Sequence, residues 1–408
     1  MFKDKILEQY CELVLKFGVN LQEKQGLYIV CPIERADVAE ALTLKAYKMG
    51  AKKVLIVWEN EEIDRLTYLY ADEEELKKVP KWFVDSRNFL VNENYCYIAV
   101  SAENPSAFSD VPANRIATAV RAKGKALKKY SEAVMGNAIR WCVISAPTID
   151  WAKQVFPNSQ DPLKDLSEAI QKTMRLSENN TIIDWEKHVK FLNQKASFLN
   201  EKNFDFLYLK NKFGTDIKVG LADNHVWLSA LEKDKNGIEF IANLPTEEVF
   251  TAPHKNRVDG VIKSALPLCY NGQIIDNFTI RFKNGKIQSF SAEKGYETLK
   301  NLIETDRGTL HLGEIALIGK NSPIAQSKIL FFNTLFDENA SCHLAIGKGY
   351  RTTIKNGEKL SKTELSKSGL NDSVEHVDFM IGTDDLEIYG VNKYGEQTQI
   401  FTNGEWTI

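Results

Sequence analysis

The sequence of 408 residues lacks several features that define common classes of protein. Its six cysteines are scattered and form no CxxC pair, which indicates buried free thiols in a reducing compartment instead of a disulfide framework or a zinc knot. No apolar run approaches the roughly 20 residues that cross a bilayer, and nothing at the N-terminus resembles a signal peptide. We therefore expect a cytoplasmic protein without a membrane partner.

A strong charge and the motifs that bind nucleotides are also missing. The chain carries 52 basic and 55 acidic residues, and its formal net charge of −3 gives no reason to expect nucleic acid as a partner. No GxGxxG sequence follows the first strand-like run and no Walker A motif occurs, so there is no nucleotide fingerprint. Histidine is absent before His188, and all six histidines lie in the rest of the chain.

The first 180 residues alternate apolar strand-like runs with helical stretches. Strands are predicted over residues 26–31, 53–58, 95–100 and 140–145, and helices over residues 1–17, 35–51, 61–78 and 114–130. This alternation predicts an α/β domain with an open, parallel, doubly wound sheet.

The pattern changes near residue 180, where we expect a boundary between domains 1–180 and 181–408, because the chain is too long for one ordinary core. A helix is predicted over residues 182–199 and another over 292–305. Short strands are predicted over residues 204–210, 217–221, 226–228, 238–242, 278–282 and 286–290, the last two forming a hairpin that turns at Asn284-Gly285. The second domain is therefore expected to be α+β, with mixed or antiparallel strands.

The stretch that organises the chain contains the adjacent carboxylates Glu247 and Glu248 between Pro245 and Pro253. The prolines limit regular structure on both sides, and the intervening residues favour an extended backbone. Neighbouring side chains of an extended segment point to opposite faces. One Glu can then face a site while the other supports the wall behind it, or a bend can bring both inward. The alternative is a solvent-exposed acidic turn.

Further candidate ligands follow along the chain. Glu314 lies inside an otherwise apolar run, where a carboxylate is costly to bury unless it is paired or bound to metal; the alternative is that it points to solvent. His376 and Asp378 alternate with apolar residues, so on a strand they share one face and form half of a divalent metal site.

Together with Glu338 and His343, these residues form a carboxylate-rich set with two histidines. That mixture suits a pair of Zn, Co, Mn or Mg ions bridged by a carboxylate. The candidate metal ligands are Glu248, Glu314, Glu338, His343, His376 and Asp378.

Four segments that contain these residues resemble, in the same order, the M29 family of metallo-aminopeptidases, the aminopeptidase T and aminopeptidase S group. They read PTEEVFT (245–251), GEIA (313–316), NASCHLA (339–345, followed by Gly349-Tyr350) and HVDFMIG (376–382), and ERAD (34–37) and MGAKKV (49–54) extend the resemblance to the first domain. The resemblance implies broad-specificity removal of N-terminal residues from peptides, a two-metal site, an α/β first domain, a distinct catalytic second domain and a homodimer.

By this resemblance, Glu248, Glu314, His343 and Asp378 match the family's metal ligands. Glu338 and His376 match further residues of the site, and Tyr350 matches a site tyrosine.

The residues then suggest roles in catalysis. Glu314 is the candidate for the carboxylate shared by the two ions, and Glu247, which adjoins a ligand, is the candidate general base. Tyr350 is the candidate donor of a hydrogen bond to the oxyanion. The alternatives are a structural or outward-facing Glu247 and a Tyr350 that serves only in packing.

Two other classes of function compete with the peptidase. A two-domain small-molecule binding protein would explain the first half, but it needs no metal ligands in the second. Another dinuclear metal-dependent amidohydrolase or a phosphoesterase could use the same ions. A phosphoesterase would also need groups for phosphate, and the second half contains neither a Gly-rich anion loop nor clustered arginines.

Overall fold

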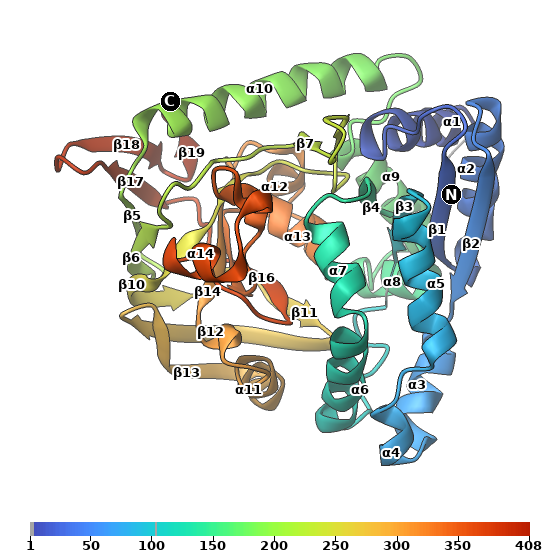
Figure 1. Ribbon diagram of the computed structural model, residues 1–408, viewed down its shortest axis with the longest axis horizontal. Coiled ribbons are helices and arrows are strands. Elements are labelled where there is room, and N and C mark those ends of the chain that lie inside the picture. Colours follow the sequence, from blue (N-terminus) through green and yellow to red (C-terminus); the bar gives the residue numbers. More distant parts are fainter. Residues whose placement is uncertain (1–3, 103) are drawn as a thin grey trace. The chain divides into compact units, whose positions relative to one another are not determined.

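The computed structural model describes residues 4–102 and 104–408 (Figure 1). Residues group into two compact units, one made of Met1–Lys190, Ala230–Thr246 and Phe331–Leu335, the other of Phe191–Ser229, Glu247–Leu330 and Phe336–Ile408. Each unit therefore draws on segments that are separate in the sequence. The boundary that we expect near residue 180 stays a prediction.

The first unit contains a parallel four-stranded sheet. Its strands are β1 (Gly26–Pro32), β2 (Lys53–Glu59), β3 (Cys96–Ser101) and β4 (Trp141–Ser145), in the order β2-β1-β3-β4. All four predicted strands are present within one or two residues. The prediction of an α/β N-terminal domain with an open parallel sheet is confirmed.

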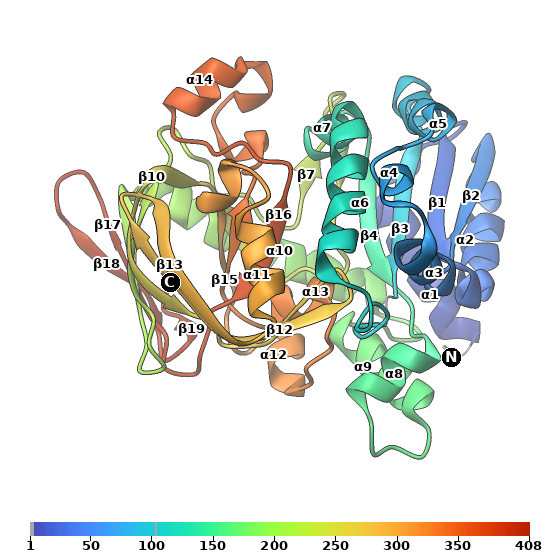
Figure 2. The ribbon, with the colours of Figure 1, turned by 90° about the horizontal axis from the view of Figure 1, so that it is seen from below.

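Helices cover both faces of this sheet (Figure 2). Helix α5 contributes Leu90 to a cluster with Tyr28 and Val30 of β1. Helix α2 connects β1 to β2 and packs on the other face of the sheet. This arrangement follows from the right-handed crossovers between parallel strands. The helices are α1 (Asp4–Leu13), α2 (Ala36–Lys48), α3 (Glu61–Tyr70), α4 (Glu73–Leu76), α5 (Lys81–Asn92), α6 (Ala113–Ala126), α7 (Lys128–Met135), α8 (Ile149–Val155) and α9 (Pro162–Thr173).

Several predicted helix boundaries were wrong. The predicted helix 61–78 is interrupted because Ala71 is extended (φ −66°, ψ 148°), which separates α3 from α4. The predicted helix 114–130 divides at Leu127 into α6 and α7. The first helix continues as a π-helix over Val14–Gly18, and residues 1–3 of its predicted span lie outside the described residues.

The second unit contains a nine-stranded antiparallel sheet, in the order β11-β12-β10-β6-β5-β17-β18-β19 with β13 paired to β12. The hairpin predicted at Asn284-Gly285 is confirmed, since both residues have positive φ (48° and 76°) between β12 and β13. The strands are β5 (Phe206–Lys210), β6 (Asp216–Leu221), β10 (Pro253–Lys263), β11 (Leu268–Tyr270), β12 (Gln273–Lys283), β13 (Lys286–Lys294), β17 (Glu387–Val391), β18 (Gln397–Thr402) and β19 (Glu405–Trp406).

A second, four-stranded antiparallel sheet in this unit is formed by β9 (Val249–Thr251), β14 (Leu312–Leu317), β15 (His343–Gly347) and β16 (His376–Met380), in the order β16-β15-β14-β9. Every residue of β14 and β15 is buried. These antiparallel sheets confirm the predicted α+β class of the second domain.

The remaining helices and short strands differ in part from those that the sequence predicts. The predicted helix 182–199 is present in α10, whereas the predicted helix 292–305 begins only at Tyr296, because β13 continues to Lys294 and Gly295 has φ 74°. Residues 226–228 form no strand but an isolated bridge at Leu228, and the predicted strand 238–242 is only β8. The bounds are α10 (Thr181–Lys202), β7 (Glu232–Lys233), β8 (Glu239–Phe240), α11 (Tyr296–Ile303), α12 (Pro323–Ser327), α13 (Thr334–Asp337) and α14 (Lys362–Lys367).

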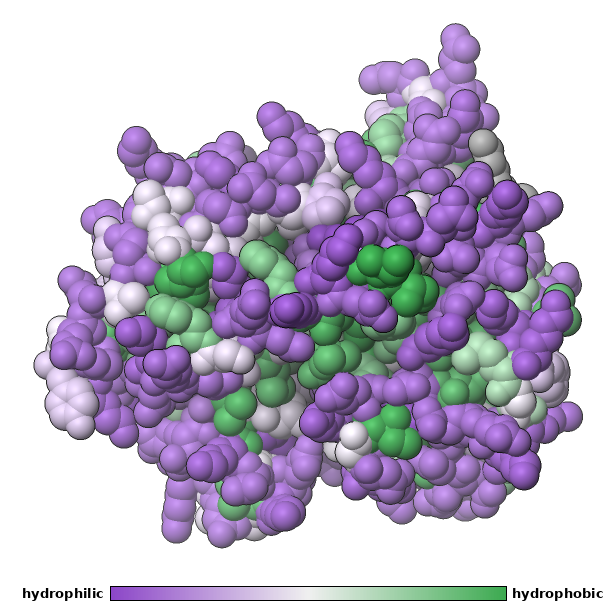
Figure 3. Space-filling view, turned by 90° about the horizontal axis from the view of Figure 1, so that it is seen from above, coloured by the Kyte–Doolittle hydropathy of each residue, from purple (hydrophilic) through white to green (hydrophobic). Residues whose placement is uncertain are grey.

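Among the described residues, no helix is both long and apolar enough to cross a membrane. The face of the molecule in Figure 3 is mostly hydrophilic, with apolar side chains exposed among the polar ones.

Candidate metal centre

The register of the four-stranded sheet places the candidate ligands on one face. Glu314 of β14 is opposite Ala345 of β15, which is in turn opposite Asp378 of β16. Residues opposite each other in neighbouring strands project to the same side of a sheet, as do residues two apart in one strand. His343 and His376, two residues from Ala345 and Asp378 respectively, therefore share this face. The small Ala345 leaves room between the two carboxylates.

Glycine at position 313 is required by the same local structure. A Cβ atom there would lie 2.3 Å from the backbone oxygen of Lys348 and 2.5 Å from that of Gly347. The register of β14 against β15 shifts between Leu312 and Glu314, where this close approach occurs. The Gly-Glu pair therefore lets the backbone of the neighbouring strand come close immediately before the buried carboxylate.

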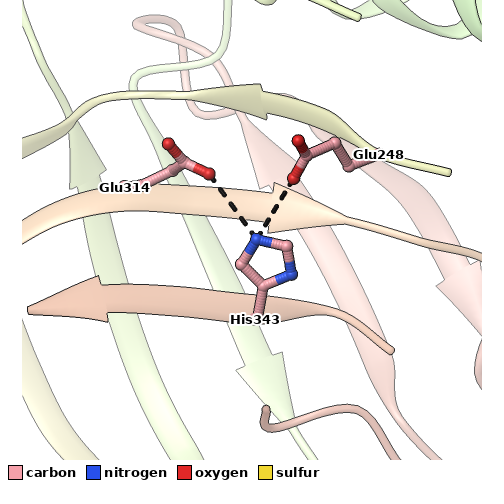
Figure 4. Close-up of side chains that lie close together, drawn as sticks. All are labelled: Glu248, Glu314 and His343. Carbon is pink, nitrogen blue, oxygen red and sulfur yellow. Dashed lines mark ion pairs between the residues drawn. The ribbon is translucent and has the colours of Figure 1, made fainter. Parts of the chain in front are cut away.

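His343 is the centre of one group of ligand atoms (Figure 4). Its Nε2 lies 3.2 Å from Oε2 of Glu248 and 3.5 Å from Oε1 of Glu314. Glu248 directly precedes β9 and is 7% exposed, while His343 is 1% exposed. Two carboxylates and an imidazole nitrogen thus converge in a buried position.

A second group of ligand atoms shares Glu314 with the first. Nε2 of His376 lies 3.7 Å from Oε2 of Glu314 and 3.5 Å from Oδ1 of Asp378. Oδ1 of Asp378 is also 3.8 Å from Nε2 of His343. Each carboxylate oxygen of Glu314 therefore faces a different imidazole.

Backbone carbonyls fix the orientation of both imidazoles. Nδ1 of His343 lies 2.8 Å from the carbonyl oxygen of Glu338, and Nδ1 of His376 lies 2.6 Å from that of Lys348. A carbonyl can only accept a hydrogen bond, so each Nδ1 carries the proton. In the neutral tautomer each Nε2 then presents a lone pair toward carboxylate oxygens, as in histidines that bind metal.

The electrostatics of the site show strong coupling between these groups. Burial raises the pKa of Glu314 to about 7, an effect that the His343 hydrogen bond opposes. Burial lowers the pKa of His376, but Asp378 and Glu314 outweigh it and raise this pKa to about 10. The pKa of Asp378 is lowered because the two histidines outweigh its burial. In the absence of a bound cation, the protonated imidazoles of His343 and His376 would balance the negative charge of the buried carboxylates.

These residues fit a divalent metal ion. Oδ1 of Asp378 is buried and accepts no hydrogen bond within the part of the chain that the structure describes, although buried polar atoms normally have a partner. Imidazole nitrogens and carboxylate oxygens both bind Zn, and carboxylate oxygens suit Mn and Mg.

Glu338 lies close to these groups without belonging to either of them. It begins a short 3₁₀ helix (Glu338–Ala340), and burial, followed by the carboxylates of Asp378 and Glu248, raises its pKa well above the ordinary value. Its Oε1 accepts a hydrogen bond from Nδ2 of Asn339 at 3.3 Å.

Both candidate catalytic residues lie near candidate ligands, since Glu247 adjoins Glu248 in the chain and Tyr350 packs on His376. Glu247 is 5% exposed, and its backbone N–H donates to Oδ1 of Asn339 at 2.7 Å. It is therefore no exposed acidic turn. The ring of Tyr350 lies edge-on to His376 with 4.9 Å between centroids, and 6.0 Å from the ring of Phe250.

Sequence reasoning missed two contributors to this arrangement, Asn339 and Ala345. Both lie in the NASCHLA segment that we quoted for its histidine. For Asn339, the available signal was its position directly after the acidic residue Glu338. Nothing local signals the second, since its importance depends on strand register.

The chain is similar to known proteins over nearly its whole length. A family model described as thermophilic metalloprotease (M29) matches residues 3–406. The chain is 42% identical over 405 residues to "Aminopeptidase 2" of Geobacillus stearothermophilus, an alignment that covers 99% of this chain and 98% of that protein. It is 41% identical over 402 residues to "Aminopeptidase AmpS" of Bacillus subtilis (strain 168), covering 98% of each.

Solved structures show the same relationship. The structure of wild-type AmpT from Thermus thermophilus matches with a TM-score of 0.91 at 35% identity, covering 99% of both chains. A 2,5-dihydroxypyridine dioxygenase from Pseudomonas putida KT2440 matches with a TM-score of 0.52 at 11% identity, covering 100% of this chain and 98% of the other. The second similarity concerns the fold alone.

Proposed function

We propose a two-ion mechanism for this chain, which belongs to the M29 family of thermophilic metalloproteases and is a metal-dependent aminopeptidase acting on peptides. The observation that carries the proposal is the position of Glu314. Its Oε1 and Oε2 face Nε2 of His343 and Nε2 of His376, at 3.5 and 3.7 Å respectively. This geometry supports a carboxylate that two divalent ions would share.

The ligands divide into two sets around that carboxylate. Glu248 and His343 would hold one ion with Glu314, and His376 and Asp378 would hold the other. Glu338 is proposed as a further ligand, because its buried carboxylate interacts with those of Asp378 and Glu248. When bound, divalent ions polarise a substrate carbonyl and lower the pKa of water by several units.

The chain's own residues would then move the proton and stabilise charge. Glu247 is proposed to take a proton from the attacking water and to donate it to the leaving amine. Its neighbour Glu248 faces the ligand cluster. Because both residues precede β9, a bend in the chain would bring the Glu247 carboxylate inward as well, in a role other than that of a ligand. Tyr350, whose ring contacts His376, is proposed to donate a hydrogen bond to the carbonyl oxygen as negative charge develops there.

We further propose broad specificity for peptides with a free N-terminus, Zn, Co, Mn or Mg as the metal, a homodimer as the assembly and the cytoplasm as the compartment. The free α-amine would contact the anionic site, and this contact would restrict cleavage to the first peptide bond.

A metal add-back assay tests the function. Metal-stripped protein would be mixed with a panel of chromogenic aminoacyl substrates, and each divalent ion would be restored separately. We expect activity to return with Co, Zn or Mn, and we expect N-acetylated versions of the same substrates to resist. Full activity in excess chelator, with no metal found by elemental analysis, would refute the two-ion mechanism.

A further inference from the structure

One buried amide joins two segments of the site that are 92 residues apart. Asn339 has no exposed surface. Its Oδ1 accepts the backbone N–H of Glu247 at 2.7 Å, while its Nδ2 donates to Oε1 of Glu338 at 3.3 Å. A backbone N–H can only donate, so the amide oxygen must face Glu247, and the NH₂ group then faces a carboxylate that accepts. Both ends of the side chain are chemically matched to their partners.

The turn that carries this amide is itself held on two sides. The carbonyl oxygen of Glu338 lies 2.8 Å from Nδ1 of His343, and that of Asn339 accepts a hydrogen bond from Oγ of Ser322 at 3.4 Å. The backbone on which the amide is mounted is therefore fixed by neighbours outside the turn. The Asn339 side chain can act as a rigid support.

The peptide group that Asn339 binds precedes the nearest strand in the chain. Strand β9 begins only at Val249. The carbonyl oxygen of this peptide, that of Thr246, lies 2.7 Å from Nε2 of His188, and its N–H, that of Glu247, reaches Asn339. The Asn339 side chain, from a distant part of the sequence, thus helps to set the tilt of the peptide plane. A change in that tilt would turn the carboxylate of Glu247.

We infer that Asn339 is a positioning residue that acts through Glu247: its amide oxygen holds the peptide plane of residue 247, so that the Glu247 carboxylate reaches the attacking water. This inference rests on the role of Glu247 in the proposed function. Asn339 thus has a different role from the neighbouring candidate ligands. The shorter of its two hydrogen bonds is with the backbone N–H of Glu247, and the longer is with the carboxylate of Glu338.

A double-mutant cycle tests the inference. Asn339→Ala would be made in the wild-type chain and in the Glu247→Gln background, with kcat, KM and bound metal measured for each protein. We expect Asn339→Ala alone to lower kcat by about 10- to 100-fold, since a misplacement of ~1 Å can cost about 10²-fold. KM should change by less than about threefold and metal content should match the wild type. In the Glu247→Gln background the same change should alter kcat by less than about threefold, because the group through which it acts is already gone.

Asn211→Ala is the matched control. Asn211 is another buried asparagine whose Oδ1 accepts two backbone N–H groups, those of Gly214 and Thr215, and it contacts none of the site residues through this oxygen. We expect wild-type kcat for this variant. Asn339→Ser, which removes less of the side chain, would replace Asn339→Ala in the same cycle if the alanine variant does not fold.

Four results would overturn the inference. A wild-type kcat for Asn339→Ala beside a slow Glu247→Gln enzyme would refute the positioning role and leave the proposed function intact. Equal losses of kcat in both backgrounds would show that Asn339 does not act through Glu247, as would a loss of bound metal that parallels the loss of kcat. A wild-type kcat for Glu247→Gln would instead refute the assignment of the base, and the inference would fail with it.

Discussion

Removing the metal should lower the thermal stability of the unit that contains the site. Four carboxylates, those of Glu248, Glu314, Glu338 and Asp378, are each less than 10% exposed within one small region. Buried like charges are costly unless they are paired or bound to a cation. Without ions the site can reduce its charge only by taking up protons, and the raised pKa values of Glu314 and Glu338 indicate this tendency.

The size of the effect follows from mass action. An ion that binds only the folded protein and is present at about 100 times its Kd adds about 2.7 kcal/mol to the free energy of unfolding. All the proposed ligands lie in the second unit, which has roughly 200 residues, and 1 kcal/mol shifts Tm by about 2–4 °C at that size. One ion should therefore raise Tm by about 5–11 °C, and two ions by about twice as much.

Differential scanning calorimetry measures this directly. Metal-stripped protein would be scanned with increasing concentrations of each divalent ion, with monovalent salt at matched ionic strength as the control. Tm should rise with the logarithm of the metal concentration, and Glu314→Gln should reduce the rise because it weakens both proposed ion sites. A Tm that stays within about 1 °C over a thousandfold range of metal, in protein whose activity still needs that metal, would refute the reasoning.

Three further predictions concern roles and assembly. Glu247→Gln should retain bound metal and substrate affinity but lower kcat by roughly 10²–10⁴-fold, which is the usual contribution of a proton-transfer group. Glu248→Gln should lose metal, because an amide is a weaker ligand than a carboxylate. Elemental analysis together with steady-state kinetics distinguishes the two roles. Tyr350→Phe should keep the ring packing on His376 and lower kcat by about 10²-fold through loss of one hydrogen-bond donor. Light scattering at micromolar concentration should give twice the chain mass of 46.3 kDa.

Each of these predictions would be contradicted by a specific result. Metal loss in Glu247→Gln with metal retained in Glu248→Gln would reverse the assignment of the pair. A near-wild-type Glu247→Gln would move the base elsewhere, with Glu338 the next candidate. An unchanged kcat in Tyr350→Phe would leave that residue a packing aromatic, and a monomer mass would contradict the homodimer.

The sequence alone determined much of the local structure. Apolar runs between helical stretches predicted strands at 26–31, 53–58, 95–100 and 140–145, and the primed turn at Asn284-Gly285 followed from the positive φ that those two residues tolerate. The alternation in His376-Val377-Asp378 put its two polar side chains on one face of β16, as the structure has them. Such patterns act over a few residues, so a local reading can detect them.

Only the tertiary structure decided which distant residues meet and in what orientation. The pairing of Glu314 with Ala345, and of Ala345 with Asp378, depends on strand register, and a shift of one residue would turn each side chain to the opposite face. The two oxygens of Glu314 face different histidines because three strands are in the correct register at once. The amide of Asn339 meets Glu247 across 92 residues of chain. These contacts arise from the cooperative packing of the whole sheet, and no stretch of a few residues contains the information that specifies them.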